Sequence, residues 1–216
     1  EALRNSNVSV QGATMYVNLE PCAHFGKTPP CVDALVGAKV RRVVVGMTDP
    51  NPEVKGRGIR RLRRAGIDVV TGVLREVCKR VNEDFCTTVR TGRPFVTLKL
   101  AASLDGRIAT SAGDARWISG KSSRRLVHEL RDRVDAVMVG AETVKADDPQ
   151  LTCRIRGGRD PFRVVIDGQL RTDPKARVCT LMSKAKTIIV ATPQAARSRG
   201  HLFVKLPVEI EQFKSR

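Results

Sequence analysis

Two cysteines in the first part of the chain stand where a thiol could bind a metal. Cys22 comes shortly after an apolar run, residues 13–19, and Cys31 opens a second apolar stretch. The amino terminus of a helix carries a partial positive charge that favours thiolate over thiol, and thiolate is the form that binds zinc. The pair therefore offers two ligands of a tetrahedral Zn2+ site. Two ordinary reduced cysteines remain the alternative.

The remaining cysteines lack such a context, and we interpret them as structural: Cys78, Cys86, Cys153 and Cys179. Six cysteines in 216 residues are too few for a small disulfide scaffold. The cysteine usage therefore favours a metal site in a reducing compartment, and a cytoplasmic location is expected.

The elements that must position the two cysteines follow from apolar runs separated by turn residues. The predicted strands of this first region are residues 13–19, 43–47 and 67–70. The predicted helices are residues 30–38, 59–65 and 74–90. Strands that alternate with helices favour an α/β unit with a largely parallel sheet.

The pattern breaks at Thr91-Gly92-Arg93-Pro94, and a domain boundary is predicted there. Beyond it, strands are expected at residues 95–102, 136–140, 163–166 and 187–191. An amphipathic helix over residues 121–133 would be capped by Ser119 and would bury one face, formed by Leu126, Val127 and Leu130. The second region is therefore predicted to be another α/β unit.

Composition and charge narrow the classes of partner. Hydrophobic residues make up 41% of the chain and aromatic residues 4%, and no apolar run approaches the ~20 residues that span a bilayer. The formal net charge of +17 is compatible with nucleic acid, an anionic surface or phosphorylated ligands. No aromatic residue interleaves the arginines of residues 41–64 to stack on bases. We therefore expect no specific nucleic acid and no membrane as partner.

The two cysteines also belong to a longer motif. Two stretches, Leu19-Glu20-Pro21-Cys22 and Gly26-Lys27-Thr28-Pro29-Pro30-Cys31, resemble the zinc-binding segment of the cytidine-deaminase superfamily. Most nucleic-acid deaminases of this superfamily place two residues between the cysteines. The eight residues found here resemble the bifunctional riboflavin-biosynthesis deaminase/reductase family. The resemblance implies Cys22 and Cys31 as Zn2+ ligands and Lys27, Asp49 and Asn51 as contacts to a phosphoribosyl substrate.

The resemblance places the third zinc ligand and the proton-shuttling Glu in a His-Ala-Glu segment upstream of this chain. Glu1 is therefore not expected to be the catalytic Glu, and the catalytic residue stays unknown. Glu20 matches a structural residue of the family, and His24 is an alternative ligand from the loop. Because the chain opens on Glu1 without an initiator Met, we expect a fragment of a longer protein.

The second region resembles the reductase domain of the same family, in the family's order. The matching stretches are Lys99 to Arg107, Trp117-Ile118-Ser119, Arg131, Gly140 to Val144, Asp147 to Thr152 and Arg154. The resemblance implies an NADPH site lined by Ala101, Trp117, Thr143 and Asp147. It implies substrate contacts from Lys99, Arg131, Leu151 and Arg154, and arginine suits a phosphate. The sequence contains no Gly-x-Gly-x-x-Gly element, so a Rossmann nucleotide-binding site is not indicated.

Together the resemblances imply an α/β chain in which the C-terminal part of a cytidine-deaminase-like domain is followed by the N-terminal part of a dihydrofolate-reductase-like domain. Residues 1–92 would form a zinc-dependent deaminase domain without its N-terminal portion. Residues 94–216 would form an NADPH-dependent reductase domain without its C-terminal portion.

The implied function is riboflavin biosynthesis: hydrolytic deamination of a diaminopyrimidinone ribosyl phosphate, then reduction of its ribosyl to a ribityl chain. The implied partner is a small phosphorylated pyrimidine, and a homo-oligomer is left open. Two alternatives stand beside this function. One is a nucleic-acid or nucleoside deaminase, which the +17 charge suggests, and the other is a catalytically inactive basic binding module.

Overall fold

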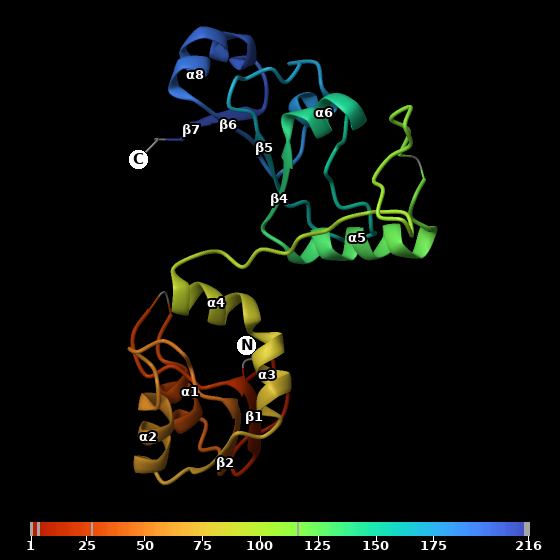
Figure 1. Cartoon of the computed structure of the whole chain (residues 1–216). Helices are drawn as coiled ribbons and strands as arrows, with labels where there is room; N and C mark the ends of the chain where they lie inside the picture. Colours follow the sequence, from red (N-terminus) through yellow and green to blue (C-terminus); the bar gives the residue numbers. More distant parts are fainter. Residues whose placement is uncertain (1, 4, 27, 116, 214–216) are drawn as a thin grey trace. The chain divides into compact units, whose positions relative to one another are not determined.

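The computed structural model describes residues 2–3, 5–26, 28–115 and 117–213. The chain separates into two compact units, Glu1–Lys99 and Leu100–Arg216. Each unit has its own parallel sheet (Figure 1). None of the helices in the described ranges is both long and apolar enough to cross a bilayer.

A three-stranded parallel sheet forms the centre of the first unit. Its strands are β1 (Thr14–Leu19), β2 (Arg42–Met47) and β3 (Asp68–Thr71), and β2 lies in the middle. Val17 pairs with Val45, and Val43 pairs with Val69. Because the three strands are parallel, the loops that follow β1 and β2 leave the sheet at the same edge.

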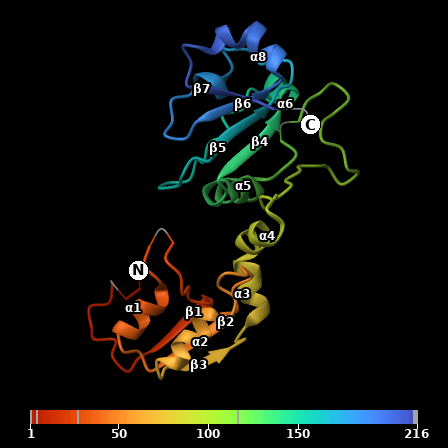
Figure 2. The same cartoon turned by 90° about the vertical axis from the view of Figure 1, so that its left-hand side faces the viewer.

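Helices cover both faces of this sheet. They are α1 (Cys31–Gly37), α2 (Arg57–Arg64) and α3 (Arg75–Val81), whereas α4 (Glu83–Thr91) packs against α3. Val43 and Val45 of β2 share a buried core with Leu35 of α1 and Leu62 of α2. Gly46 faces the opposite side, where Cys78 of α3 lies against it. Helix α3 is labelled beside β2 in Figure 2. Alternate residues of β2 therefore meet different helices.

The predicted strands of the first unit are confirmed to within one residue. The predicted helix 74–90 is instead two helices that meet at Asn82. The Asn82 side chain donates to the carbonyl oxygen of Cys78 at 2.8 Å, and its backbone leaves the helical region with φ −109° and ψ 25°. Asparagine competes with the helix through such local hydrogen bonds, which explains the break.

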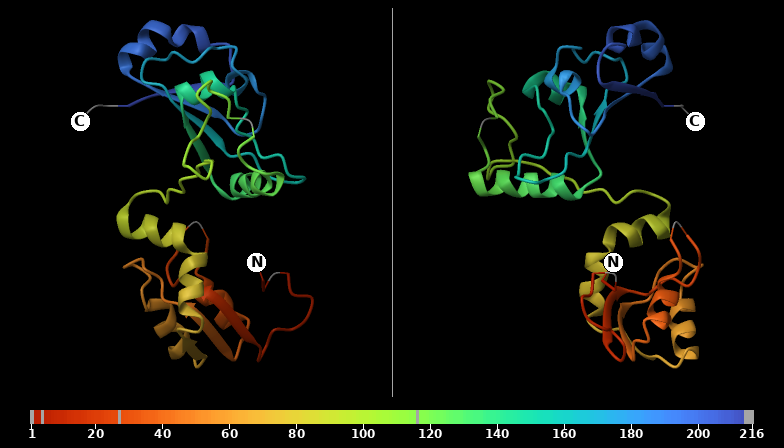
Figure 3. Two further views of the ribbon diagram at one scale, coloured as in Figure 1. Left: turned by 45° about the vertical axis from the view of Figure 1, so that its right-hand side comes forward. Right: turned by 180° about the vertical axis from the view of Figure 1, so that it is seen from behind.

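A four-stranded parallel sheet forms the centre of the second unit. The strands lie in sequence order: β4 (Ala136–Gly140), β5 (Phe162–Ile166), β6 (Thr187–Ala191) and β7 (Val208–Gln212). The helices are α5 (Lys121–Arg133), α6 (Ala141–Asp147), α7 (Arg177–Thr180), α8 (Pro193–Arg199) and the short 3-10 helix η1 (Gly200–Phe203). Helix α8, blue in Figure 3, packs against β7. The core includes Val144, Val165, Ile189 and Phe203.

The predicted strand over residues 95–102 is not formed. Val96, Leu98 and Leu100 alternate as a strand would, yet all three are more than 70% exposed. A strand needs a neighbouring strand to accept and donate its main-chain hydrogen bonds. Neither sheet in the described residues includes this segment, so the alternation alone does not produce a strand.

Two predictions about helix α5 are also corrected. The helix begins after Gly120, and no side chain caps its amino terminus, so Ser119 is not the cap. Leu126 is 56% exposed, whereas Val127 and Leu130 are half-buried. The predicted apolar face is therefore only partly packed.

Candidate functional sites

The two cysteines of the metal-binding motif lie in direct contact. Cys22 follows the carboxyl end of β1, and Cys31 is the first residue of α1. The main-chain N–H of Cys31 donates to Cys22 Sγ at 3.3 Å, and the N–H of Val32 donates to the Cys22 carbonyl oxygen at 3.2 Å. Burial raises the pKa of Cys31, and the hydrogen bond and charge of Cys22 raise it further. Two thiolates so close repel each other, and a divalent cation between them would relieve that repulsion.

The cysteine pair fits zinc chemically, because thiolates are its preferred ligands. Across residues 2–3, 5–26, 28–115 and 117–213, no group of three or more His, Cys, Asp or Glu side chains is placed to hold a metal. His24 is exposed in the loop after Cys22 and does not complete such a group. In the described residues, the candidate zinc ligands are therefore Cys22 and Cys31 alone.

Glu20 holds the loop after β2 next to the cysteines through hydrogen bonds to its main chain. Its side chain is 3% exposed and accepts three main-chain hydrogen bonds. The donors are Asp49 at 3.2 Å, Gly56 at 2.9 Å and Ile59 at 3.1 Å. Gly58 allows the close approach, since a Cβ at this position would overlap the carbonyl oxygen of Pro21. Both carboxylate oxygens are occupied, so Glu20 acts as a structural residue.

Asp49 and Asn51 lie at the same sheet edge as the cysteines. Asp49 is 6% exposed, and its Oδ1 accepts the main-chain N–H of Asn51 at 2.8 Å in an Asx turn. Burial raises the pKa of Asp49, and the charge of Glu20 adds to this effect against the opposing hydrogen bond from Asn51. The first unit thus gathers Cys22, Cys31, Asp49 and Asn51. Lys27 lies outside the described residues.

In the second unit, Arg131 lies beside the segment of residues 152–154, which ends with Arg154. Arg131 of α5 donates from Nη1 to the carbonyl oxygen of Thr152 at 3.0 Å. Burial lowers the pKa of Arg131, and the positive charge of Arg154 lowers it further. No salt bridge in the part of the chain that the structure describes involves either arginine. Two guanidinium groups close enough to repel each other, with no carboxylate between them, are suited to an anion.

Leu151, which directly precedes this segment, differs from the arginines in the direction of its side chain. Its side chain is buried in the core of the second unit, and its backbone has a φ of +57°. The left-handed conformation is uncommon for a residue other than glycine. The buried side chain of Leu151 therefore packs in the core, and only its main chain remains for the predicted substrate contact.

The residues predicted to line the NADPH site are not enclosed. Thr143 and Asp147 lie exposed on α6, and Ala101 and Trp117 belong to the coil before α5. Trp117 is 74% exposed, and the guanidinium of Arg124 lies 4.4 Å from the centroid of its ring. Because none of the four is buried, they form no closed pocket in the described chain. Lys99 is likewise exposed and lies in coil instead of at a strand end.

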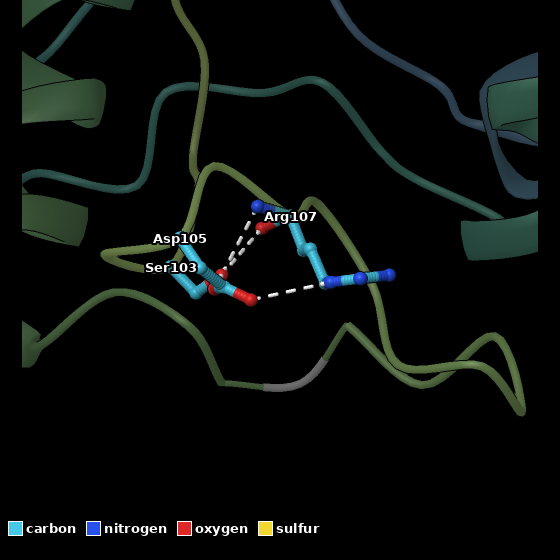
Figure 4. A network of polar contacts seen from close by, with 3 residues as sticks. All are labelled: Ser103, Asp105 and Arg107. Carbon is cyan, nitrogen blue, oxygen red and sulfur yellow. Dashed lines mark hydrogen bonds and ion pairs between the residues drawn. The ribbon is translucent and has the colours of Figure 1, made fainter.

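A tight turn formed by residues 103–107 lies between Ala101 and Trp117. Ser103 Oγ donates to Asp105 Oδ1 at 2.5 Å, and Arg107 Nε donates to Asp105 Oδ2 at 3.2 Å (Figure 4). Gly106 has a φ of +80°, a conformation that glycine adopts without strain. The hydrogen bond from Ser103 is the main cause that lowers the pKa of Asp105.

Two protein families match the chain. The cytidine and deoxycytidylate deaminase zinc-binding region matches residues 1–47, and the RibD C-terminal domain matches residues 94–215. The chain belongs to the RibD family.

Individual RibD proteins match most of the chain. The riboflavin biosynthesis protein RibD of Aquifex aeolicus is 45% identical over 88% of this chain and 53% of its own length. The Escherichia coli RibD is 46% identical over 82% of this chain and 52% of its own length. The chain therefore spans about half the length of these curated RibD relatives.

Solved RibD structures have the same fold. The first form of Acinetobacter baumannii RibD has a TM-score of 0.84 at 39% identity, covering 99% of this chain and 60% of that one. A Thermotoga maritima structure has a TM-score of 0.79 at 38% identity, covering 99% of this chain and 65% of that one. Its title describes a diaminohydroxyphosphoribosylaminopyrimidine deaminase/5-amino-6-(5-phosphoribosylamino)uracil reductase.

The RibD family matches correct the fold assignment made from the sequence. That assignment described a C-terminal part of a deaminase-like domain followed by an N-terminal part of a reductase domain, and it is wrong. The zinc-binding region matches residues 1–47, at the N-terminal end of the chain, and the RibD C-terminal domain matches residues 94–215, at the C-terminal end. Motifs of a few residues indicate a family, but they do not fix the ends of a domain.

One residue of the second unit was missed by sequence reasoning. His128 lies on α5 and accepts the main-chain N–H of Arg154 at its Nδ1, at 3.1 Å. It stands three residues before Arg131, a spacing that places two side chains on the same helix face. That spacing was the signal that could have identified it.

Proposed function

We propose that this chain carries parts of both activities of a riboflavin-biosynthesis deaminase/reductase. Its first unit would serve the hydrolytic deamination of a diaminopyrimidinone ribosyl phosphate, which exchanges a ring amino group for a carbonyl and releases ammonia. Its second unit would serve the reduction in which hydride from NADPH and a proton open the ribosyl ring to a ribityl chain. We place this enzyme in the cytoplasm, because all six cysteines are free thiols.

The first unit would hold one zinc ion and the phosphoribosyl substrate. Cys22 and Cys31 would bind the metal. Zn2+ supplies a Lewis acid that makes water a nucleophile near neutral pH. Asp49 would accept hydrogen bonds from ribose hydroxyls, and Asn51 and Lys27 would contact the rest of the phosphoribosyl group.

The second unit would bind the deaminated product and the cofactor. Arg131 and Arg154 would hold the phosphate by charge-assisted hydrogen bonds, with Leu151 beside them. Lys99 would orient the ribosyl group. NADPH supplies the hydride, and Ala101, Trp117, Thr143 and Asp147 would contact it.

The observation that carries the proposal is the contact between Cys22 and Cys31 at the sheet edge that also holds Asp49. The 3.3 Å hydrogen bond joins the main-chain N–H of Cys31 to Cys22 Sγ at the amino terminus of α1, although eight residues separate the two cysteines in the chain. Nucleoside chemistry at the carboxyl edge of a parallel sheet follows the general rule for open α/β sheets.

The experiment measures zinc content, ammonia release and NADPH oxidation on the same purified full-length protein. Cys22→Ser and Cys31→Ser should each reduce bound zinc and ammonia release and leave NADPH oxidation unchanged. Cys78→Ser, which changes a half-buried thiol on α3, is the matched control. Full zinc in the Cys22→Ser/Cys31→Ser double variant would remove the two cysteines as ligands.

A further inference from the structure

His128 connects helix α5 to the segment that ends at Arg154. Its ring nitrogen Nδ1 accepts the main-chain N–H of Arg154 at 3.1 Å. Its main-chain carbonyl oxygen accepts the thiol of Cys153 at 3.4 Å. Arg131, three residues further along α5, donates to the carbonyl oxygen of Thr152 at 3.0 Å. Thr152, Cys153 and Arg154 are thus each hydrogen-bonded to helix α5.

The ring of His128 can make this contact in one protonation state. A nitrogen that accepts an N–H must carry no proton, so the ring is neutral and its proton sits on Nε2. Burial lowers the pKa of His128, the charges of Arg131 and Arg154 lower it further, and a main-chain hydrogen bond with Thr152 opposes them. The surroundings therefore favour the neutral ring at neutral pH.

We propose that His128 is a positioning residue of the phosphate site, whose neutral ring fixes the main chain of Arg154 so that Arg131 and Arg154 bind one dianion together. This inference rests on the proposed function of the second unit. Two arginines bind one dianion more tightly when both are held in place beforehand, because each side chain otherwise loses rotamer freedom on binding. Arg131 is anchored through Thr152, and His128 provides the corresponding anchor for Arg154.

Protonation of His128 should release this anchor. An imidazolium has a proton on both nitrogens, so Nδ1 can no longer accept the N–H of Arg154. The charged groups that face the ring are Arg131 on its own helix and Arg154 on the adjoining segment, and both oppose protonation. Anion affinity should therefore fall on the acidic side of the usual histidine range, not at neutral pH.

The test measures the dissociation constant of inorganic sulfate, a dianion that does not titrate between about pH 5 and 8, the range in which histidine changes charge. Binding is followed by NMR through the side-chain Nε–H signals of the arginines. His128→Ala removes the acceptor and should weaken sulfate binding at neutral pH about fivefold, the effect of one hydrogen bond. His128→Asn places an amide oxygen near the position of Nδ1, so it should bind within about twofold of the unchanged protein.

The pH profile separates a positioning role from a purely structural one. The unchanged protein should lose affinity as the pH falls to about 5, while His128→Asn should stay flat because its amide does not titrate. Equal affinity of His128→Ala and the unchanged protein would overturn the proposal. The proposal would also be overturned if His128→Asn lost sulfate affinity with falling pH to the same extent as the unchanged protein. That result can be obtained even if His128→Ala does not fold.

The same titration distinguishes this inference from the proposed function. If Arg131→Ala and Arg154→Ala abolish sulfate binding and His128→Ala does not, the phosphate site stands and the role of His128 fails. If the unchanged protein binds neither sulfate nor ribose 5-phosphate, the phosphate site and the inference fail together.

Discussion

Glu20 shows how one buried side chain can define a site without taking part in its chemistry. The three main-chain N–H groups that it accepts belong to the loop after β2 and to the first turn of α2, 29 to 39 residues away in the sequence. A carboxylate satisfies three donors because its two oxygens offer about four acceptor positions and no proton. Without it, the buried donors of Asp49 and Ile59 and the half-buried donor of Gly56 would lose their acceptor.

Glu20→Gln should therefore destabilise the first unit by about 1.5 to 3 kcal/mol, the usual contribution of hydrogen bonds to a charged group. The amide keeps the shape but replaces an acceptor oxygen with an NH2 group that faces other donors. Urea unfolding followed by circular dichroism measures the effect. Glu53→Gln, an exposed carboxylate of the same loop, is the control and should change stability little. Equal stability of both variants would contradict the structural role of Glu20.

At the candidate sites, the sequence located residues better than it located their contacts. The contact between Cys22 and Cys31 agrees with the zinc-ligand hypothesis, because both residues stand at element ends that the apolar pattern marked. The hydrogen bond between His128 and Arg154 was missed. Its donor is a main-chain N–H, which every residue except proline carries, so the residue type at position 154 does not indicate it. The roles of the NADPH and substrate residues stay predictions.

Among the elements, the strands were predictable and the segments that depend on distant partners were not. Strands β2 and β6 are runs of β-branched residues, which pack well on a pleated surface. Residues 95–102 carry the same local signal, but a strand forms only where another strand pairs with it. The break at Asn82 depends on one side-chain hydrogen bond, which a helical periodicity does not reveal.

Gly46 in β2 should be intolerant of a side chain, since α3 approaches it closely. A Cβ at Gly46 would overlap Cys78 Sγ and press on the carbonyl oxygen of Asn18. Gly46→Ala should therefore destabilise the first unit by about 1 to 3 kcal/mol through overpacking. Gly37→Ala, at the end of α1 where no atom lies within 4 Å of the new Cβ, is the control. Urea midpoints for the two variants that coincide would show that α3 does not pack at this distance.

The turn after β5 should make the second unit sensitive to acid. Asp167 is 3% exposed, and its Oδ2 accepts the main-chain N–H and the hydroxyl of Thr172 at 2.6 and 2.7 Å. Burial alone would raise the pKa of Asp167, but hydrogen bonds from Arg171 and Thr172 outweigh it and hold the pKa below the ordinary 3.8.

A carboxyl whose pKa is depressed by folding stabilises the folded state above its ordinary pKa. This stabilisation is lost as the pH falls from that value through the pKa of the folded state. Asp167→Asn should therefore lower stability at neutral pH and flatten its decline below the ordinary pKa of 3.8. Urea unfolding at neutral and acidic pH measures both effects. A variant with the same acid dependence as the unchanged protein would exclude Asp167 as the titrating group.

On the scale of the whole molecule, the net charge is +17, and most of the Lys and Arg side chains are exposed, although Arg163 is buried. Helix α2 carries five arginines, but it buries Ile59 and Leu62 and keeps its basic residues on the exposed side. Arg61 forms a salt bridge with Asp33 of α1 at 2.6 Å. Such a surface attracts polyanions without selecting a sequence.

Nucleic acid should therefore bind this protein weakly and without sequence preference. Affinity for a short DNA duplex should fall at least about tenfold between about 50 and 200 mM salt, because binding releases counterions. Fluorescence anisotropy with two unrelated duplexes measures this dependence. Tight binding of one duplex alone at the higher salt concentration would favour a nucleic-acid enzyme over one acting on a small molecule.

The exposed segment of residues 95–102 also determines how a protease would divide the chain. Trypsin cleaves a peptide that can enter its active site in an extended conformation. Segments without helix or sheet hydrogen bonds adopt that conformation most readily. Arg93 is protected by the proline that follows it, whereas Lys99 is exposed in coil. Brief digestion should therefore cut after Lys99 and release fragments that coincide with the two compact units. Whether each fragment survives longer digestion would report which unit can stay folded by itself.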